Sequence, residues 1–91
     1  MTESRQTRLK RLRLRSWRRG IRETDLILGG FADTGLAALD DAALDAYEAL
    51  MEENDWDIYY WVTGARVVPE AHLAMIDTLR RNAGLGSGKP S

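Results

Sequence analysis

The sequence has no cysteine and a single histidine, His72, among its 91 residues. Without cysteine the chain can form no disulfide bond, thiolate nucleophile, iron–sulfur cluster or cysteine–zinc site. One histidine also excludes a metal motif built from a histidine pair, and no glycine-rich phosphate-binding loop is present. The side chains that most often carry covalent or metal chemistry are therefore missing, and we expect a protein that is not an enzyme.

Long apolar runs are also absent, and none approaches the roughly 18–20 residues that a membrane span needs. The N-terminal segment has no apolar core and so lacks the pattern of a secretory signal. It is rich in arginine and poor in acids, which is similar to a mitochondrial presequence. A bacterial cytosolic protein is the simpler interpretation, and the mitochondrial matrix would be the location in a eukaryote. The 91 residues predict one domain, too small to enclose a large substrate cavity.

Charge is divided unevenly along the chain. Residues 1–22 carry nine basic side chains and one acidic side chain, a net charge of +8. Residues 23–91 carry four basic and thirteen acidic side chains, a net charge of −9. Both signs lie close together at the junction, which favours docking on another macromolecule over even solvation of the surface.

Helix-forming residues dominate, and β-branched residues never alternate over the length of a strand. We therefore expect an all-α protein, a small five-helix bundle in a single domain over residues 1–83, followed by a flexible tail over residues 84–91. Capping and helix-stopping residues predict the individual helices. The first covers residues 5–18, the second begins near residue 21, and the third follows an Asp40 cap. The fourth runs from an Asn54 or Asp55 cap to Gly64, and the fifth runs from Pro69 to Gly84.

The first two expected helices each contain an unusual feature. The arginine-rich helix has only two narrow apolar strips, so we expect it to pack partly and to leave most of its arginines in solvent. These strips are Leu9 with Leu12 and Leu14 with Trp17. The second helix contains the glycines at 29–30, and a mid-helix glycine costs about 1 kcal/mol relative to alanine. A break at this pair is therefore plausible.

The junction between the two charged parts is Arg-Arg-Gly-Ile-Arg-Glu, residues 18–23. Gly20 permits another surface to approach the backbone without a Cβ in the way. Arginine offers a planar fork to the carboxylates, phosphates or carbonyls of a partner, and the spacing predicts that Arg19 and Glu23 lie near each other. Glu23 is able to pair with a neighbouring arginine or to accept donors from a partner. The plainer interpretation is a helix C-cap followed by a carboxylate at the next helix start.

Residues on both sides of this junction extend the pattern. They are Arg18, Arg19, Gly20, Glu23 and Asp25, which form Arg-Arg-Gly-x-x-Glu-x-Asp, then Phe31, Leu50 and Asp55-x-Asp57-Ile58-x-x-Trp61. The combination spans about residues 9–82 and resembles the FAD assembly factor family, also called succinate dehydrogenase assembly factor 2 or SdhE-like. The hexapeptide alone is a weak motif, but together with the Asp-x-Asp pair and the tryptophan it is specific.

The resemblance implies a five-helix bundle that assists the assembly of another protein. Members promote covalent attachment of FAD to a histidine of the succinate dehydrogenase flavoprotein subunit, and in some bacteria of fumarate reductase. The resemblance further implies that Arg19, Gly20 and Glu23 form the core of the partner-binding site, supported by Arg18 and Asp25. It also implies that the second helix continues through the glycine pair, in which this chain differs from commoner members.

The missing reactive groups define the expected mechanism. We expect the protein to bind the flavoprotein and to hold its FAD site in the conformation in which the flavin's own chemistry completes the bond. It would act on the FAD of this partner and bind no cofactor tightly itself. We expect no nucleic acid as a partner, no membrane insertion, and a monomer when the protein is free.

Other interpretations stay open from the sequence alone. The basic N-terminal helix is a fair electrostatic footprint for nucleic acid, although the acidic remainder of the chain would repel phosphates. A regulatory adaptor is another alternative.

Single residues also permit more than one interpretation. Trp56, Tyr59, Tyr60 and Trp61 suggest flavin stacking, but core packing of Trp61 and one tyrosine, with the others partly exposed, is the plainer account. The acidic residues 52–57 lack the glycine and terminal glutamate of a calcium loop, which favours a solvated helix cap. We expect the single histidine on the surface of the last helix.

Overall fold

The computed structural model describes residues 3–84, and these fold into an all-α bundle as the sequence predicts. The elements are α1 (Arg5–Ser16), α2 (Arg22–Thr34), η1 (Leu36–Ala38), α3 (Asp41–Leu50), α4 (Asp55–Thr63), η2 (Glu70–His72) and α5 (Leu73–Asn82), where η marks a short 3₁₀ helix. Residues 85–91 lie outside the described part, so the tail there stays a prediction. In the described part no helix has the length and apolar character needed to cross a membrane.

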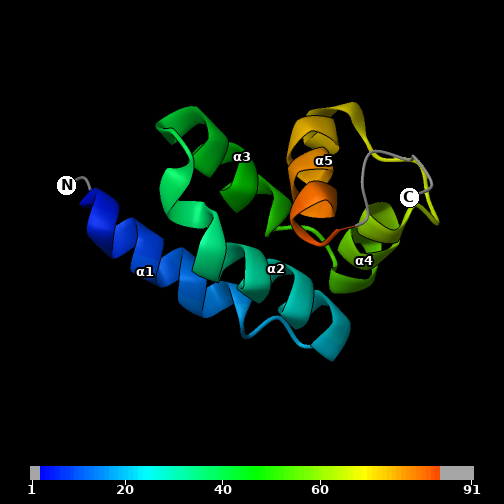
Figure 1. Cartoon of the computed structure of the whole chain (residues 1–91), viewed down its shortest axis with the longest axis horizontal. Helices are drawn as coiled ribbons and strands as arrows, with labels where there is room; N and C mark the ends of the chain where they lie inside the picture. Colours follow the sequence, from blue (N-terminus) through cyan, green and yellow to red (C-terminus); the bar gives the residue numbers. More distant parts are fainter. Residues whose placement is uncertain (1–2, 85–91) are drawn as a thin grey trace.

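The helices are arranged so that α1 and α2 lie side by side and run in opposite directions (Figure 1). α4 and α5 lie together on the other side of the molecule, and α2 contacts both of them. Apolar side chains from all five helices meet in one core. Its fully buried members include Leu12, Leu28, Leu44, Tyr47, Leu50, Ile58, Ile76 and Leu79.

The predicted helix caps are largely confirmed. Asp40 accepts a hydrogen bond from the Ala43 backbone N–H at 2.8 Å, and Asn54, rather than Asp55, caps α4 through the Trp56 N–H. Gly64 ends α4 in the left-handed conformation that suits glycine. The first helix is shorter than expected, because it ends at Ser16 with Trp17 as its cap.

A buried group of hydroxyls joins the first three helices. The Ser16 and Tyr47 hydroxyl oxygens lie 2.5 Å apart, and the Tyr47 hydroxyl also donates to the Leu28 carbonyl at 3.3 Å. Burial raises the pKa of the Tyr47 hydroxyl to about 12. The tyrosine therefore stays neutral and holds α1, α2 and α3 together.

The α2 helix continues through Gly29 and Gly30 without a break. The break suggested by helix propensity is therefore wrong, and the continuous helix implied by the family resemblance is confirmed. Gly29 is needed because the Trp17 ring lies directly on it, and a Cβ at this position would fall 2.3 Å from a ring carbon. The Trp17 indole N–H donates to Asp33 at 3.2 Å, which fixes the ring. By contrast, a Cβ on Gly30 would meet nothing within 4 Å.

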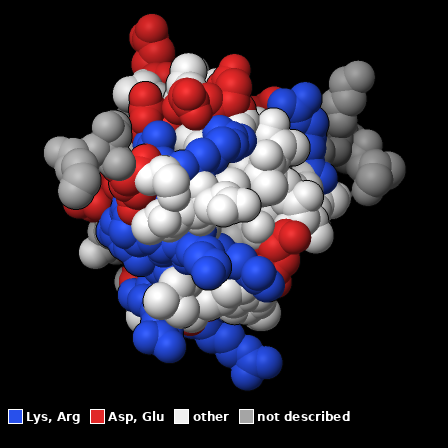
Figure 2. All heavy atoms as spheres, turned by 90° about the vertical axis from the view of Figure 1, so that its left-hand side faces the viewer, with Lys and Arg blue, Asp and Glu red and all other residues white. Residues whose placement is uncertain are grey.

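The expectation that most arginines of α1 stay in solvent is wrong, because three of the five are half-buried and the exposed Arg5 and Arg13 are ion-paired. An ion-pair ladder connects α1 to α3 and to Glu52 just after the end of α3. It is defined here by the pairs Arg5–Asp41, Arg8–Asp45, Arg8–Glu48, Arg11–Glu48 and Arg15–Glu52. Figure 2 shows a band of basic side chains with acidic side chains gathered beside it. Hydrogen bonds from Arg11 and then Arg8 lower the pKa of Glu48. The basic and acidic parts of the sequence therefore neutralise each other within the fold.

The prediction that His72 lies on the surface of the last helix is wrong. His72 ends η2, one residue before α5, and only 8% of it is exposed. Its ring packs on Trp61 with 5.6 Å between centroids, and its Nε2 lies 2.9 Å from a Glu53 carboxylate oxygen. The 3₁₀ turn after Pro69 delays the start of α5 and turns the histidine inward.

Trp61 lies in the core as predicted. Tyr59 and Tyr60 are only half-buried, so the expectation that one of them joins Trp61 in the core is wrong. These two rings and the exposed Trp56 pack against each other with centroids 5.9–6.0 Å apart. Their mutual contacts form one aromatic cluster on α4.

Candidate functional site

The turn between α1 and α2 brings together the five residues predicted as the partner-binding site. At its centre, Gly20 has a φ of 135°, a backbone conformation that residues with a Cβ rarely adopt. A Cβ there would also lie 3.0 Å from an Asp55 carboxylate oxygen. Both facts require glycine at this position, and the missing side chain leaves the backbone exposed.

Arg19 points inward from this turn to the connection between α3 and α4. Its Nε donates to Asp55 at 2.7 Å, and its two terminal nitrogens donate to the backbone carbonyls of Met51 and Glu53. Only 11% of the Arg19 side chain and 19% of the Asp55 side chain are exposed. Arg19 therefore positions the turn and does not lie on its outer surface. Within residues 3–84 Arg19 forms no ion pair with Glu23, because its guanidinium is bonded to the α3–α4 connection.

Asp25 holds the same turn from its other end. Its carboxylate accepts a hydrogen bond from the Arg19 backbone N–H at 2.7 Å. The neighbouring Thr24 is fully buried and donates its hydroxyl hydrogen bond to the Asp55 carbonyl at 2.9 Å. Arg19 and Thr24 thus fix the turn and the start of α2 against the start of α4, and Asp25 fixes the turn to α2. The expected solvated cap at residues 52–57 is wrong for Asp55, whose side chain is 19% exposed.

The outer surface of the turn is formed by Arg18, Gly20 and Glu23, all of them exposed. No side-chain hydrogen bond or ion pair to Arg18 or Glu23 occurs within residues 3–84. Glu23 lies in the first turn of α2, where a carboxylate is favoured by the helix dipole. The five predicted residues thus divide into an exposed set of three and a supporting pair, Arg19 and Asp25.

Arg22 and Leu26 lie on the exposed side of α2 next to this turn, and neither was among the five residues predicted for the partner-binding site. Leu26 is 55% exposed and so offers an apolar side chain beside the charged turn. The side chain of Arg22 has no ion pair or hydrogen bond within the described residues. Their spacing of four residues places them on one helix face, a signal that the sequence contains.

The ion-pair ladder bears on the nucleic-acid interpretation. Four of the arginines that supplied the electrostatic footprint are paired with carboxylates, three of them with acids of α3 and the fourth with Glu52 just after it, so a phosphate backbone would have to displace these acids. In residues 3–84 no three histidine, aspartate or glutamate side chains are grouped so that they could hold a metal ion.

These features define a small all-α protein with an exposed, charged turn around a glycine, held from inside by an arginine and an aspartate. The chain belongs to the Sdh5 family, described as flavinator of succinate dehydrogenase, and the family model matches residues 10–83. The family resemblance found in the sequence is thereby confirmed.

Curated relatives agree with this assignment. A protein of Meyerozyma guilliermondii named succinate dehydrogenase assembly factor 2, mitochondrial, is 51% identical over 61 residues, which is 67% of this chain and 45% of the relative. Proteins of the same name from Mycosarcoma maydis and Schizosaccharomyces pombe are each 44% identical over 68 residues, or 75% of this chain. The matches span 29% and 49% of those two relatives, so the chain corresponds to less than half of their length.

Proposed function

We propose that this protein promotes the covalent attachment of FAD to the flavoprotein subunit of succinate dehydrogenase, or of fumarate reductase in some bacteria. The observation that carries the proposal is the exposed Arg18–Gly20–Glu23 surface in a chain that belongs to the flavinator family. The relatives are named assembly factors, and a firmly held docking surface suits that role.

In the proposed mechanism the protein binds one conformation of the flavoprotein more tightly than the others. Binding of this kind shifts the partner's conformational equilibrium by the difference in affinity between the two states. The covalent step would take place within the partner, and this protein adds no reactive group. The buried position of its own His72, against Trp61 and Glu53, supports a role without proton transfer.

The residues of the turn have different roles in this mechanism. Gly20 is the point at which the flavoprotein backbone approaches most closely, because no side chain covers it. Arg18 offers its guanidinium fork to a carboxylate or carbonyl of the partner, and Glu23 accepts hydrogen bonds from partner N–H groups. Arg19 and Asp25 hold these groups in position, which lowers the entropy lost on binding.

The proposal is tested by measuring flavin fluorescence of the FAD-free flavoprotein subunit on a denaturing gel, after incubation with FAD with and without this protein. We expect more covalent flavin when the protein is present. Glu23→Ala should remove the effect, whereas Glu70→Ala, which removes an exposed acid of η2, should retain it. Equal fluorescence with and without the protein would contradict the proposal.

Gly20→Arg is a poor probe of binding alone, because the positive φ and the nearby Asp55 make it disturb the turn itself. Arg18→Ala is the better second variant, since its side chain has no bonds to lose within residues 3–84. If Glu23→Ala and Arg18→Ala lose both activity and helical circular dichroism, the turn is structural and is not a docking surface.

The location and assembly of the protein follow from the proposed partner. The relatives are named mitochondrial proteins, and we place this protein in the same compartment as its client, the mitochondrial matrix in a eukaryote or the cytoplasm in a bacterium. We propose a monomer in the free state and no tightly bound cofactor. Light scattering and the absorbance spectrum of the purified protein check these two statements.

A further inference from the structure

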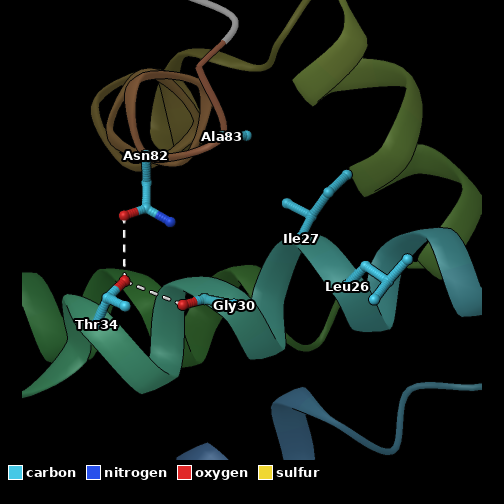
Figure 3. Close-up of a pocket in the computed structure, with 6 residues that line it drawn as sticks. All are labelled: Leu26, Ile27, Gly30, Thr34, Asn82 and Ala83. Atoms are coloured by element: carbon cyan, nitrogen blue, oxygen red, sulfur yellow. Dashed lines mark hydrogen bonds between the residues drawn. The ribbon is translucent and has the colours of Figure 1, made fainter.

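An open groove of about 470 Å³ lies between α2 and the end of α5. It is lined by Leu26, Ile27, Gly30, Thr34, Asn82 and Ala83. Figure 3 shows that the α2 residues form its floor and that Asn82 closes one end by reaching to Thr34. The Thr34 hydroxyl lies 3.3 Å from the Asn82 side-chain oxygen and also donates to the Gly30 carbonyl at 3.0 Å. This polar end is therefore already bonded within the protein.

Gly30 is the residue that keeps the floor of the groove open. Glycine is the least favourable helix residue after proline, and its presence in mid-helix usually has a packing reason. Gly29 has such a reason, because Trp17 lies on it. Gly30 has none inside the described structure, since a Cβ there would meet nothing within 4 Å. What Gly30 provides is the open space of the groove on the outer face of the helix.

The groove is continuous with the charged turn. Arg22, Leu26 and Gly30 follow each other at intervals of four residues, so they form one stripe along α2. The stripe begins beside the exposed Arg18 and Glu23 and ends in the groove. The side chains of Arg18 and Arg22 have no ion pair within residues 3–84, so this end of the stripe is complementary to carboxylates.

We propose that the groove receives an apolar side chain from a segment of the client flavoprotein, and that a carboxylate of the same segment lies beside Arg22. The inference rests on the proposed function and extends its docking surface along α2. A protein segment fits better than a flavin nucleotide, because the lining of the groove contains no cation to meet a diphosphate. Leu26, Ile27 and Ala83 instead offer an apolar contact, which is a common centre of protein–protein interfaces.

The test fills the groove and measures binding of the purified FAD-free flavoprotein subunit by biolayer interferometry. We expect Gly30→Leu to raise the dissociation constant at least about tenfold, as the loss of a central interface contact does. Ala49→Leu is the matched control, because it adds a leucine at an exposed position of α3, away from the groove. It should leave the dissociation constant within about threefold of the wild type.

Leu26→Asp is the second variant, because it removes an apolar wall at an already exposed position and does not depend on the fit of a larger side chain. It should weaken binding to a similar extent while circular dichroism stays helical. Wild-type affinity in both Gly30→Leu and Leu26→Asp would overturn the groove assignment even if covalent flavin attachment is promoted normally.

Failure of the proposed function has a different signature, since the wild-type protein would then neither bind the flavoprotein nor increase its covalent flavin. Free FAD provides the remaining outcome. If wild-type protein quenches the fluorescence of FAD alone and Gly30→Leu does not, the groove takes a flavin, and the assignment to a protein segment is overturned.

Discussion

The arginines of α1 and those of the following turn belong to one basic stretch of sequence, but the fold uses them differently. Arg8, Arg11 and Arg15 are half-buried and paired, the first two with Glu48 of α3 and the third with Glu52 just after that helix. Arg18 and Arg22 are exposed and have no ion pair within residues 3–84. A count of charges along the chain therefore overestimates the positive surface that a partner meets. The docking signal lies in the charges that the fold leaves unpaired.

The same distinction applies within the turn. Arg18 and Arg19 are neighbours of the same residue type, yet the Arg19 side chain donates all of its hydrogen bonds to residues 51–55 between α3 and α4, and the Arg18 side chain has none within residues 3–84. Gly29 and Gly30 form a second such pair, the first covered by Trp17 and the second open to the groove. In each pair one residue supports the fold and the other is available to a partner. Single substitutions at the two positions are able to separate these two roles.

Arg19→Ala gives the largest expected effect on stability. It leaves the Asp55 carboxylate and two backbone carbonyls without their donor in a mostly buried position, so we expect a loss of about 3 kcal/mol in the free energy of unfolding. Arg18→Ala should change this free energy by less than about 0.5 kcal/mol. Urea denaturation followed by circular dichroism measures both.

Arg19→Lys is the control for charge. A lysine keeps the positive charge but cannot reproduce the planar fork that meets three acceptors, so we expect only partial recovery of stability. Equal stability of the Arg18→Ala and Arg19→Ala variants would contradict the division of the turn into an exposed and a supporting part.

Gly29→Ala is expected to have the next largest effect. The added methyl group would overlap the Trp17 ring, which is fixed by its hydrogen bond to Asp33, so α1 and α2 would have to separate. We expect a loss of about 2 kcal/mol, typical of overpacking. Thermal unfolding of the variant measures the loss. Restored stability in the double variant with Trp17→Ala would identify the ring as the cause.

The sequence predicted the helices well because their caps are local. Asp40, Asn54 and Gly64 act on backbone groups within a few residues, and the apolar spacing that defines the core repeats within each helix. The glycine pair was harder to interpret, because the reason for Gly29 is the ring of Trp17, twelve residues away in sequence but adjacent in space.

The candidate site was predictable only in part for the same reason. The family motif located the turn, but the inward direction of Arg19 depends on Asp55, which lies 36 residues further along the chain. The burial of His72 likewise depends on Glu53 and Trp61, and no local pattern around the histidine indicates it. Pairings between distant residues decide which charges stay exposed.

The ion-pair ladder should make the protein sensitive to acid. Hydrogen bonds from Arg11 and Arg8 lower the pKa of Glu48 below its ordinary value of 4.5. The resulting stabilisation is fully present above pH 4.5 and is lost as the pH falls through the lower pKa of the folded state.

Glu48→Gln tests this contribution directly. At neutral pH we expect it to cost about 1 kcal/mol, within the range of partly exposed ion pairs. Part of the acid sensitivity of the melting temperature should disappear in this variant, whereas Glu70→Gln should retain all of it. An unchanged acid profile in Glu48→Gln would mean that the ladder contributes little to stability, and α1 would then be held mainly by its apolar contacts.

Gly30→Ala gives the smallest expected effect, and its sign is opposite to that of Gly29→Ala. The methyl group meets no atom within 4 Å, and alanine is the better helix former, so the free energy of unfolding should rise by about 0.5–1 kcal/mol. Differential scanning calorimetry of the two single variants measures both signs under identical conditions. A loss of stability in Gly30→Ala would mean that the fold itself needs this glycine. A gain in stability would mean that Gly30 lowers the stability of α2 and that what it provides is the open groove.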